Sequence, residues 1–217
     1  MDLLKAMKER KSVRAYANRT VSRKLIEEII TCAGMAPSAI NLQPWEFVVT
    51  YGEEKDRLVR RLKKAHAERQ IPCGPGTSKP LPKKFSRRSK EALAVMEPAI
   101  AREGMPFNRF IEEGSCSFYG APIVILVTID RVFPPIRYLD VGLAVSYLLL
   151  AAHAKGLSTC PIGLVTAYGD EIAESLNISM EKEVILAVAV GYGDDHAPVN
   201  EFKTTRDPLA GIRTWYE

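Results

Sequence analysis

The sequence predicts an α/β or α+β domain in which a sheet of few strands carries helices on both faces. Two uninterrupted apolar runs, residues 122–130 and 184–190, are typical of strands that are covered on both sides. Around them, hydrophobic residues recur at the spacing of amphipathic helices. Strands separated by helices indicate a layered fold, and 217 residues suffice for one domain with a substantial core.

The first third of the chain predicts three helices and one strand. In order, these are a helix with Leu3, Leu4 and Met7 on one face, a helix over residues 23–36, a strand over residues 45–51 and a helix over residues 53–69. Asp2 and Ser22 suit helix N-caps, because their side-chain oxygens accept hydrogen bonds from free backbone amides. Pro37 ends the second helix. The β-branched and aromatic residues of the 45–51 segment favour a strand.

The middle third predicts an excursion from the core that could act as a mobile cover. Prolines and glycines crowd residues 71–82, which is the composition of a loop. Residues 83–90 are strongly basic, and a helical pattern of apolar residues resumes over residues 91–102.

The last part of the chain predicts two buried strands and a long buried helix. In order, its elements are a strand over residues 122–130, a helix over residues 140–155, a short helix over residues 169–176 and a strand over residues 184–190. The long helix is the most apolar stretch, and at residues 141–154 it is too short to span a membrane, so we expect it in the core. The tail carries Ile212, Trp215 and Tyr216, which we expect to be covered from water.

Cysteine and histidine usage predicts reduced thiols and no metal centre. The four cysteines are far apart and the three histidines are isolated, so neither shows the spacing of metal ligands. The first ten residues lack the apolar segment of a secretory signal. These features predict a cytoplasmic protein without a membrane partner.

Positive charge is concentrated in one segment. Residues 55–90 hold 13 lysines and arginines against Asp56 and Glu68, a local net charge of +11, so the rest of the chain carries −7 of the total of +4. A uniformly basic nucleic-acid-binding surface would not be divided in this way, and no nucleic-acid-binding motif accompanies the charge. We therefore expect no nucleic-acid partner.

Two smaller basic clusters lie at opposite ends of the chain. The first is Arg-Lys-Ser-Val-Arg at residues 10–14, and the second consists of Lys203 and Arg206. Arginine forks and a hydroxyl suit a phosphate, because charge-assisted hydrogen bonds to phosphate are short and often bidentate. If the fold joins the two ends, they form a phosphate clamp; otherwise they are solvated faces.

Residues 36–47, Ala-Pro-Ser-Ala-Ile-Asn-Leu-Gln-Pro-Trp-Glu-Phe, form the most specific motif. Ser38, Asn41 and Gln43 offer hydrogen-bonding groups in a row, which suit a planar heterocycle with alternating carbonyls and ring nitrogens. Alternatively, these groups satisfy the backbone of their own loop. The sequence has no glycine-rich nucleotide loop, nucleophile elbow or zinc-protease motif, which favours chemistry carried by a bound cofactor.

Further motifs follow these two in order. They are Tyr-Gly-Ala-Pro from Tyr119, Asp-x-Gly from Asp140, Gly-Leu-Ser-Thr-Cys-Pro-Ile-Gly at residues 156–163, Gly-Tyr from Gly191 and Lys-x-x-Arg-x-Pro at residues 203–208. The ordered set, over roughly residues 1–60 and 115–217, resembles the nitroreductase family of FMN-dependent NAD(P)H oxidoreductases.

The resemblance implies an α+β fold, an α/β/α sandwich whose mainly antiparallel sheet is flanked by helices. It implies one domain over residues 1–217, with a variable basic cover at about 66–118, and an intertwined homodimer with FMN sites at the interface. The implied activity is transfer of hydride from NAD(P)H through the flavin N5 to nitroaromatic, quinone or related acceptors, without a protein acid or base.

The resemblance also implies cofactor contacts. The phosphate would be held by Arg10, Ser12, Lys203 and Arg206, with Lys11 beside them. Arg14 would approach the pyrimidine edge of the flavin and stabilise negative charge there on reduction. The ring would be contacted by Pro37, Ser38 and Asn41 of the partner subunit, with Gln43 in the same motif, and by Pro161, Ile162 and Gly163. The Gly163 amide would lie near N5 and orient the hydride acceptor.

Several alternatives stay open. Thr204 and Thr205 separate the last two cations where the family more often has one residue, a departure that bears on Lys203 more than on Arg206. Cys160 could be redox-active, although an inert packed thiol is favoured. The basic segment could attract an anionic substrate or the 2′-phosphate of NADPH, or be a solvated face. A flavin-binding protein without turnover, or a dehalogenase or flavin-fragmenting member, are the alternative functions.

Overall fold

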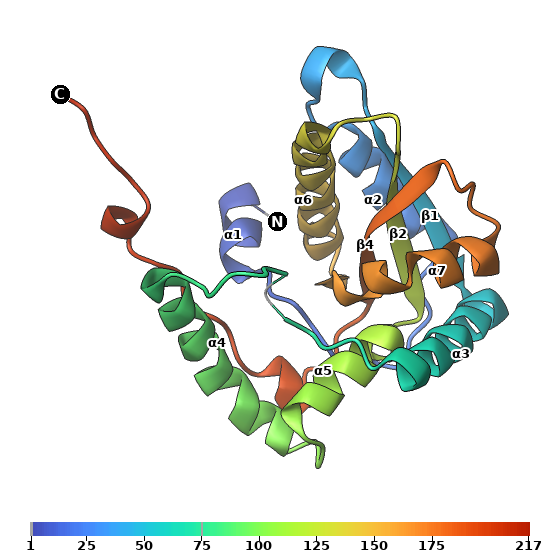
Figure 1. Ribbon diagram of the computed structural model, residues 1–217, viewed down its shortest axis with the longest axis horizontal. Coiled ribbons are helices and arrows are strands. Elements are labelled where there is room, and N and C mark those ends of the chain that lie inside the picture. Colours follow the sequence, from blue (N-terminus) through green and yellow to red (C-terminus); the bar gives the residue numbers. More distant parts are fainter. Residues whose placement is uncertain (1, 75) are drawn as a thin grey trace.

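A four-stranded antiparallel sheet forms the centre of the computed structural model, which describes residues 2–74 and 76–217 (Figure 1). The strands are β1 (Trp45–Tyr51), β2 (Ile123–Asp130), β3 (Ser158–Ile162) and β4 (Lys182–Gly191), in the order β1-β2-β4-β3. All three pairings are antiparallel, which confirms the expected α+β class. The sequence predicted no element around Pro161; the segment forms β3, an edge strand, where a missing amide donor is tolerated.

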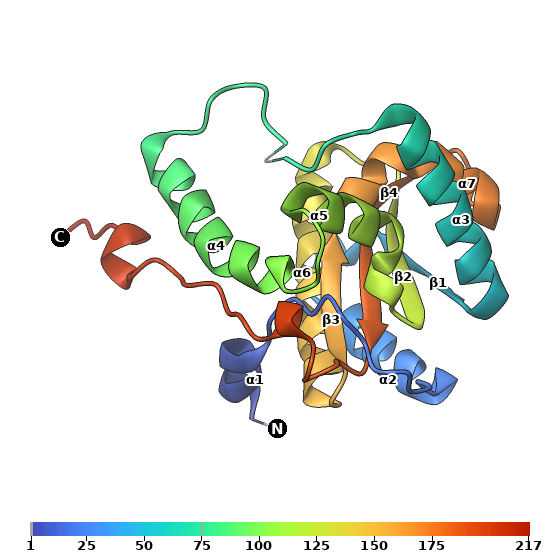
Figure 2. The ribbon, with the colours of Figure 1, turned by 90° about the horizontal axis from the view of Figure 1, so that it is seen from below.

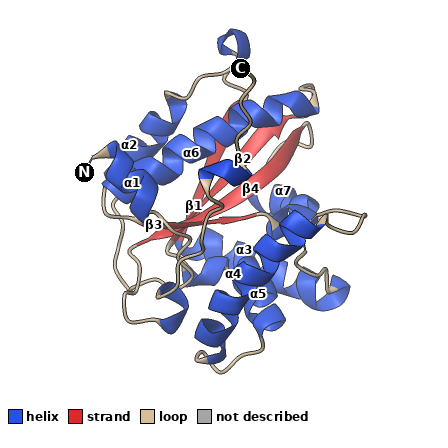
Figure 3. Ribbon diagram, turned by 90° about the vertical axis from the view of Figure 1, so that its left-hand side faces the viewer, coloured by secondary structure: helices blue, strands red, loops and turns tan. Residues whose placement is uncertain are grey.

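One face of the sheet is covered by α2 (Arg23–Gly34) and α6 (Tyr138–Ala154), and α1 (Leu3–Glu9) packs on α6. Figure 3 shows these helices on one side of the strands and the remaining large helices on the other. Ile125 and Val127 of β2 point to this face, where Ile29 of α2 and Leu148 of α6 meet them. Alternate residues of a strand point to opposite faces, so β2 contributes every second residue to this cluster.

The other face is covered by α3 (Gly52–Arg69), α5 (Phe107–Cys116) and α7 (Gly169–Leu176). Val124 and Leu126 of β2 point here and pack with Leu58 and Leu62 of α3 and with Ile172 of α7. The continuous apolar run of β2 is therefore explained by helices on both faces, as the sequence predicted.

The long helix α4 (Lys83–Ala101) stands apart from these two layers (Figure 2). It begins eight residues earlier than the helical pattern at residue 91 predicted, because the lysines and arginines that crowd its first half are good helix formers. Helix α5 was not predicted at all. A small cluster of Ile100, Ile111 and Val199 joins α4, α5 and the chain after β4.

Two apolar surfaces that we expected to be covered are exposed in the single chain. On α6, Ala144 and Leu148 are buried, but the opposite face exposes Leu139, Leu143 and Tyr147. The prediction of a buried helix therefore holds for only one face of α6 in the single chain. Among the described helices, Pro135–Ala154 has the length and apolar composition of a membrane span, a test that core helices of soluble proteins also pass.

The second exposed surface is the C-terminal tail. It projects away from the rest of the chain in Figure 1, and Ile212, Trp215 and Tyr216 are all exposed, Tyr216 almost completely at 95%. Large apolar side chains gain free energy when they leave water, so both surfaces call for a covering partner.

Candidate functional site

The two ends of the chain meet beside the edge strand β3. Ser12 forms a parallel β-bridge with Thr159, and the Val13 amide donates to the Thr159 carbonyl at 3.0 Å. A cavity of about 110 Å³ at this junction is lined by Arg10, Lys11, Ser12, Arg14, Lys203 and Arg206. The fold thus brings together the two basic clusters that lie almost 200 residues apart in the sequence. We call the cations and Ser12 around this cavity the clamp. Met96 of α4 also lines the cavity, so the middle third contributes to it.

Asn200 ties the two ends together, and sequence analysis missed it. Its Oδ1 accepts a hydrogen bond from the Arg14 amide at 2.8 Å, and its Nδ2 donates to the carbonyls of Ala15 and Asp194 at 2.8 and 2.9 Å. The Asn200 carbonyl accepts from Lys11 Nζ. The side chain is buried and both of its polar atoms form hydrogen bonds. Asn200 therefore anchors the Arg-Lys-Ser-Val-Arg segment. Only its partners in the fold distinguish it from other asparagines.

Two arginines at the junction have buried donor atoms without a protein acceptor. Within residues 2–74 and 76–217, neither Nη1 of Arg10 nor Nε of Arg14 has a hydrogen-bond partner. Burial and then the nearby Arg206 guanidinium lower the pKa of Arg10. Buried cationic donors that lack acceptors are costly, and an anion placed in the cavity would satisfy them.

Lys203 and Arg206 line the same cavity from its exposed side. Lys203 Nζ donates to the Lys8 carbonyl, and Arg206 Nη1 donates to Thr204 Oγ1 at 3.0 Å and to the Thr205 carbonyl at 2.9 Å. Both cations are solvent-exposed and donate hydrogen bonds only to neutral carbonyl and hydroxyl oxygens, so their charge is available to an anion.

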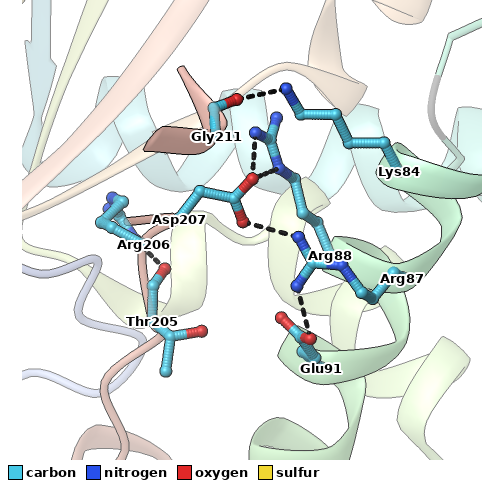
Figure 4. A network of polar contacts seen from close by, with 8 residues as sticks. All are labelled: Lys84, Arg87, Arg88, Glu91, Thr205, Arg206, Asp207 and Gly211. Atoms are coloured by element: carbon cyan, nitrogen blue, oxygen red, sulfur yellow. Dashed lines mark hydrogen bonds and ion pairs between the residues drawn. The ribbon is translucent and has the colours of Figure 1, made fainter. Parts of the chain in front are cut away.

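An acidic residue next to Arg206 fastens this segment to α4. Figure 4 shows that the Asp207 carboxylate accepts hydrogen bonds from Arg87 and Arg88, while Lys84 reaches the Gly211 carbonyl. The Arg87 Nη2 and Arg88 Nε atoms are each 2.9 Å from Asp207 oxygens. These two arginines lower the pKa of Asp207 to about 2. The contacts fix the chain direction at the residue after Arg206.

The Pro161, Ile162 and Gly163 segment ends β3. Ile162 is buried in the second core layer, Pro161 is half-buried, and Gly163 is exposed. A Cβ placed on Gly163 would meet no described atom within 4 Å, so its backbone is open to a ligand. The Gly163 carbonyl is used by Thr166, whose amide and hydroxyl donate at 3.0 and 2.9 Å.

The Pro37, Ser38, Asn41 and Gln43 loop lies at the opposite edge of the sheet. It precedes β1, whereas the clamp adjoins β3, and two strands separate these edges. Ile40, Asn41 and Gln43 have φ angles of 44°, 59° and 46°, a left-handed conformation that is costly for a β-branched residue such as Ile40. The single chain therefore does not bring this loop to the clamp.

Part of this loop satisfies itself, as the alternative interpretation proposed. Ser38 Oγ accepts from the Gln43 amide at 3.0 Å, and Gln43 Nε2 contacts the Asn41 carbonyl at 3.3 Å. Asn41 and Gln43 are nevertheless exposed, and Ile40 is 90% exposed. A loop held in a strained shape with its side chains in solvent is typical of a surface prepared for a ligand or partner.

A family comparison decides the identity of this arrangement. The model of the nitroreductase family matches residues 7–192, which is most of the chain. The chain belongs to the nitroreductase family.

Individual nitroreductases are similar over the whole length. A 4-nitrobenzoate reductase of Pseudomonas putida is 31% identical over 205 residues, covering 94% of this chain and 90% of that protein. Nitroreductase NfnB of Mycolicibacterium smegmatis is 30% identical over 214 residues, covering 95% and 88%. A solved structure of the FMN-dependent NfnB in complex with NADPH, named as from Mycobacterium smegmatis, superposes with a TM-score of 0.88 at 26% identity, covering both chains completely. The nitroreductase fold expected from the sequence is therefore confirmed.

In this nitroreductase, six of the 13 lysines and arginines of residues 55–90 form ion pairs within the part of the chain that the structure describes, Lys55 with its neighbour Asp56 among them. On α3, Arg57, Arg61 and Arg69 pair with Glu54, Glu174 and Glu171. On α4, Arg87 and Arg88 pair with Asp207. Part of the segment's charge thus links α3 to α7 and α4 to the chain after β4. Arg60 and the six lysines other than Lys55 form no ion pair among the described residues, which leaves them available to an anionic ligand.

The cysteine of the motif after α6 is buried. Cys160 is 1% exposed, and burial raises the pKa of its thiol, while Arg14 and Arg10 act in the opposite direction. The raised pKa favours the neutral thiol, which agrees with the interpretation of Cys160 as a packed, unreactive residue. Among the described residues, no group of His, Cys, Asp or Glu side chains gathers as a metal site.

Proposed function

We propose that this nitroreductase binds FMN and uses NAD(P)H to reduce nitroaromatic, quinone or related acceptors. The observation that carries the proposal is a pair of buried donors without a protein acceptor, Arg10 Nη1 and Arg14 Nε, on two arginines that line one cavity. Two relatives of similar length support the chemistry, since one is named a 4-nitrobenzoate reductase and the other was solved as FMN-dependent NfnB in complex with NADPH.

The residues at the cavity fit the phosphate end of FMN. We assign the phosphate to Arg10, Ser12, Lys203 and Arg206, with Lys11 beside them. Guanidinium forks and a hydroxyl match the donor geometry of a dianion, and a bound phosphate would offset the mutual repulsion of Arg10 and Arg206. The cavity draws on both ends of the chain and on Met96, so phosphate binding would join three separate segments.

The remaining groups fit the ring of the cofactor. Bound FMN would supply hydride acceptance and donation at N5. Arg14 would stabilise the negative charge that develops at the pyrimidine edge of the flavin on reduction. The exposed Gly163 backbone, with Pro161 and Ile162, would support the ring near N5. The chain then contributes binding and orientation, and the mechanism asks no side chain to donate or accept a proton.

The proposal includes a homodimer with an FMN site at each interface. Its support is the exposed apolar face of α6, the exposed tail and the position of the Pro37–Gln43 loop at the sheet edge far from the clamp. In such a dimer, Pro37, Ser38, Asn41 and Gln43 of one subunit would contact the flavin held by the other. We further propose a single FMN-binding domain over residues 1–217, with its variable cover at about 66–118, in a cytoplasmic enzyme.

The test is direct. Protein purified with FMN should be yellow, and anaerobic NADH or NADPH should bleach the flavin absorbance; 4-nitrobenzoate should then restore it. Protein that stays colourless after incubation with FMN would overturn the proposal. Bound FMN that neither NADH nor NADPH reduces would favour the alternative of a flavin-binding protein without turnover.

A further inference from the structure

Tyr119 lies beneath the arginine that we assign to the flavin ring. The Arg14 guanidinium carbon is 5.8 Å from the centroid of the Tyr119 ring, which is within the range of a cation–π contact. The Arg14 amide is fixed by Asn200, whereas its Nε has no hydrogen-bond partner among the described residues. The backbone of Arg14 is therefore anchored from one side, and the aromatic ring is a separate support for its side chain.

The backbone around Tyr119 is bent in an unusual way. Phe118, Tyr119 and Gly120 have φ angles of 52°, 53° and 74°, three consecutive left-handed residues of which two are aromatic. Such conformations are unfavourable for residues with a side chain, and they persist where the surrounding structure holds them. As a result the two aromatic side chains have different surroundings: Phe118 is completely buried in the core, whereas Tyr119 contacts Arg14.

Helix α5 is shaped to receive the Tyr119 ring. A Cβ at Gly114 would lie 2.3 Å from Tyr119 Cε1 and 2.6 Å from Cδ1, distances that no folded protein tolerates without movement. Glycine in a helix interior costs stability relative to alanine, so its presence here is explained by the space that the ring requires. Phe110 packs against the same ring with centroids 5.7 Å apart, and the Tyr119 hydroxyl is 3.4 Å from Ser115 Oγ.

The geometry points to Tyr119 as a positioning residue that holds the Arg14 guanidinium at the pyrimidine edge of the flavin, with Gly114 as the notch that seats its ring. This inference rests on the proposed function, because it takes Arg14 as a flavin contact. Its consequence is electrostatic. A cation held in place stabilises the negative charge of reduced FMN more than a cation that is free to move into solvent. Removing the ring should therefore weaken binding of reduced FMN more than binding of oxidised FMN.

The experiment compares four single variants and one double variant of the FMN-loaded protein by the midpoint potential of the bound flavin and by the Kd for oxidised FMN. Tyr119→Leu removes the ring. Gly114→Ala displaces the ring by a methyl group placed on α5, the helix that seats the ring. We expect each to lower the affinity for reduced FMN relative to oxidised FMN about tenfold, which lowers the two-electron midpoint by about 30 mV. The Kd for oxidised FMN should change less than about threefold, which is a smaller change in binding free energy than the tenfold effect expected for reduced FMN.

Two further variants separate positioning from general packing. Tyr119→Phe keeps the ring and removes the hydroxyl, which contacts Ser115 Oγ and the Ile111 carbonyl at 3.4 Å each and interacts with Arg14. Its midpoint should shift less than that of Tyr119→Leu, because the ring remains beneath Arg14. Tyr192→Leu is the matched control, because Tyr192 lies 3.7 Å beneath another arginine, Arg19, outside the cavity. It should leave the midpoint unchanged. The double variant Gly114→Ala/Tyr119→Leu should shift the midpoint no more than either change alone.

The outcomes distinguish the two levels of the proposal. If the wild type binds FMN but Tyr119→Leu and Gly114→Ala keep its midpoint, this inference is wrong and the proposed function stands. An equal shift in Tyr192→Leu would also overturn it, since the effect would then be one of stability. Wild-type protein that binds no FMN would overturn both. If Tyr119→Leu fails to fold, Gly114→Ala alone decides the question.

Discussion

The two edges of the sheet differ in how complete their share of the proposed FMN site is. At the β3 edge, residues from both ends of the chain converge on one cavity, and Asn200 satisfies the backbone that carries them. At the β1 edge, the Pro37–Gln43 loop is held in a strained conformation, but Asn41 and Gln43 extend into solvent. One edge holds buried cationic donors that suit an anion, whereas the other holds exposed polar side chains that suit a partner surface.

The two edges therefore indicate two different kinds of binding partner. Buried donors without acceptors, as at Arg10 and Arg14, indicate a charged ligand of matching geometry. Exposed apolar groups, as on α6 and in the tail, indicate a macromolecular surface, since burial of apolar area drives association. Both features follow from one arrangement if a second copy of the chain supplies the loop to the clamp.

The largest effect should come from the surface that joins the copies. Leu143→Asp places a charge in the middle of the apolar face of α6, where its burial in an interface would cost several kcal/mol. We expect a monomer by light scattering and a loss of FMN affinity of more than about 100-fold, because the β1-edge loop is lost with the partner. Val95→Asp, at an exposed apolar position of α4, is the control and should stay dimeric. A dimeric Leu143→Asp protein would contradict this interface.

The clamp itself should show the next largest effect. Arg206→Ala removes one charged donor from the cavity, and a hydrogen bond to a charged group contributes about 1.5–3 kcal/mol, so FMN binding should weaken about 10- to 100-fold. Isothermal titration of the apoprotein with FMN measures it. Arg60→Ala, an exposed arginine of α3 without an ion pair among the described residues, should bind as the wild type does. Unchanged FMN retention in Arg206→Ala would remove Arg206 from the phosphate site.

The contact between the clamp and α4 should show a moderate effect with a defined pH dependence. The pKa of Asp207 is lowered from 3.8 to about 2 in the folded state, so its contribution to stability is present above about pH 4 and disappears as the pH falls toward 2. We expect Asp207→Asn to lower Tm by an amount that is constant from pH 5 to 9 and that shrinks below pH 4. Amide exchange in α4 should accelerate in the variant. A Tm difference that persists at pH 2 would show that the carboxylate charge is not the cause.

The smallest effect concerns Cys160. Because burial raises the pKa of its thiol, the thiolate population at pH 8 is small and access is blocked. Iodoacetamide should leave Cys160 unmodified in the native protein and alkylate it after denaturation, as peptide mass spectrometry would show. Rapid alkylation in the native state would identify Cys160 as a reactive thiol beside the clamp.

Several parts of the fold and site were predictable from the sequence because their signals are local. The runs at residues 122–130 and 184–190 marked β2 and β4, since only strands covered on both faces combine such composition with such length. The cations at residues 10–14 and at Arg206 indicated an anion site by residue type alone. Their meeting at one cavity depended on the fold, for which the ordered motifs were needed.

Other parts have no local signal. Pro161 argued against a strand, yet an edge position makes its missing amide harmless. Asn200 acquires its role from partners about 185 residues away in sequence. Gly114 shows the same limit, because a glycine in a helix is explained only when the Tyr119 ring is seen against it. Features that depend on contacts between distant residues require the three-dimensional structure.

The central claim is that each FMN site joins the clamp of one subunit to the β1-edge loop of the other, and a mixed dimer tests it most directly. Asn41→Ala alone should weaken FMN binding about threefold to tenfold through loss of a neutral hydrogen bond. A dimer that pairs an Arg206→Ala subunit with an Asn41→Ala subunit, isolated through two different tags, would then contain one site with both defects and one site with neither. We predict that half of its sites bind FMN with wild-type affinity. If instead no site in the mixed dimer regains wild-type affinity, clamp and loop do not meet across the interface, and the account is contradicted.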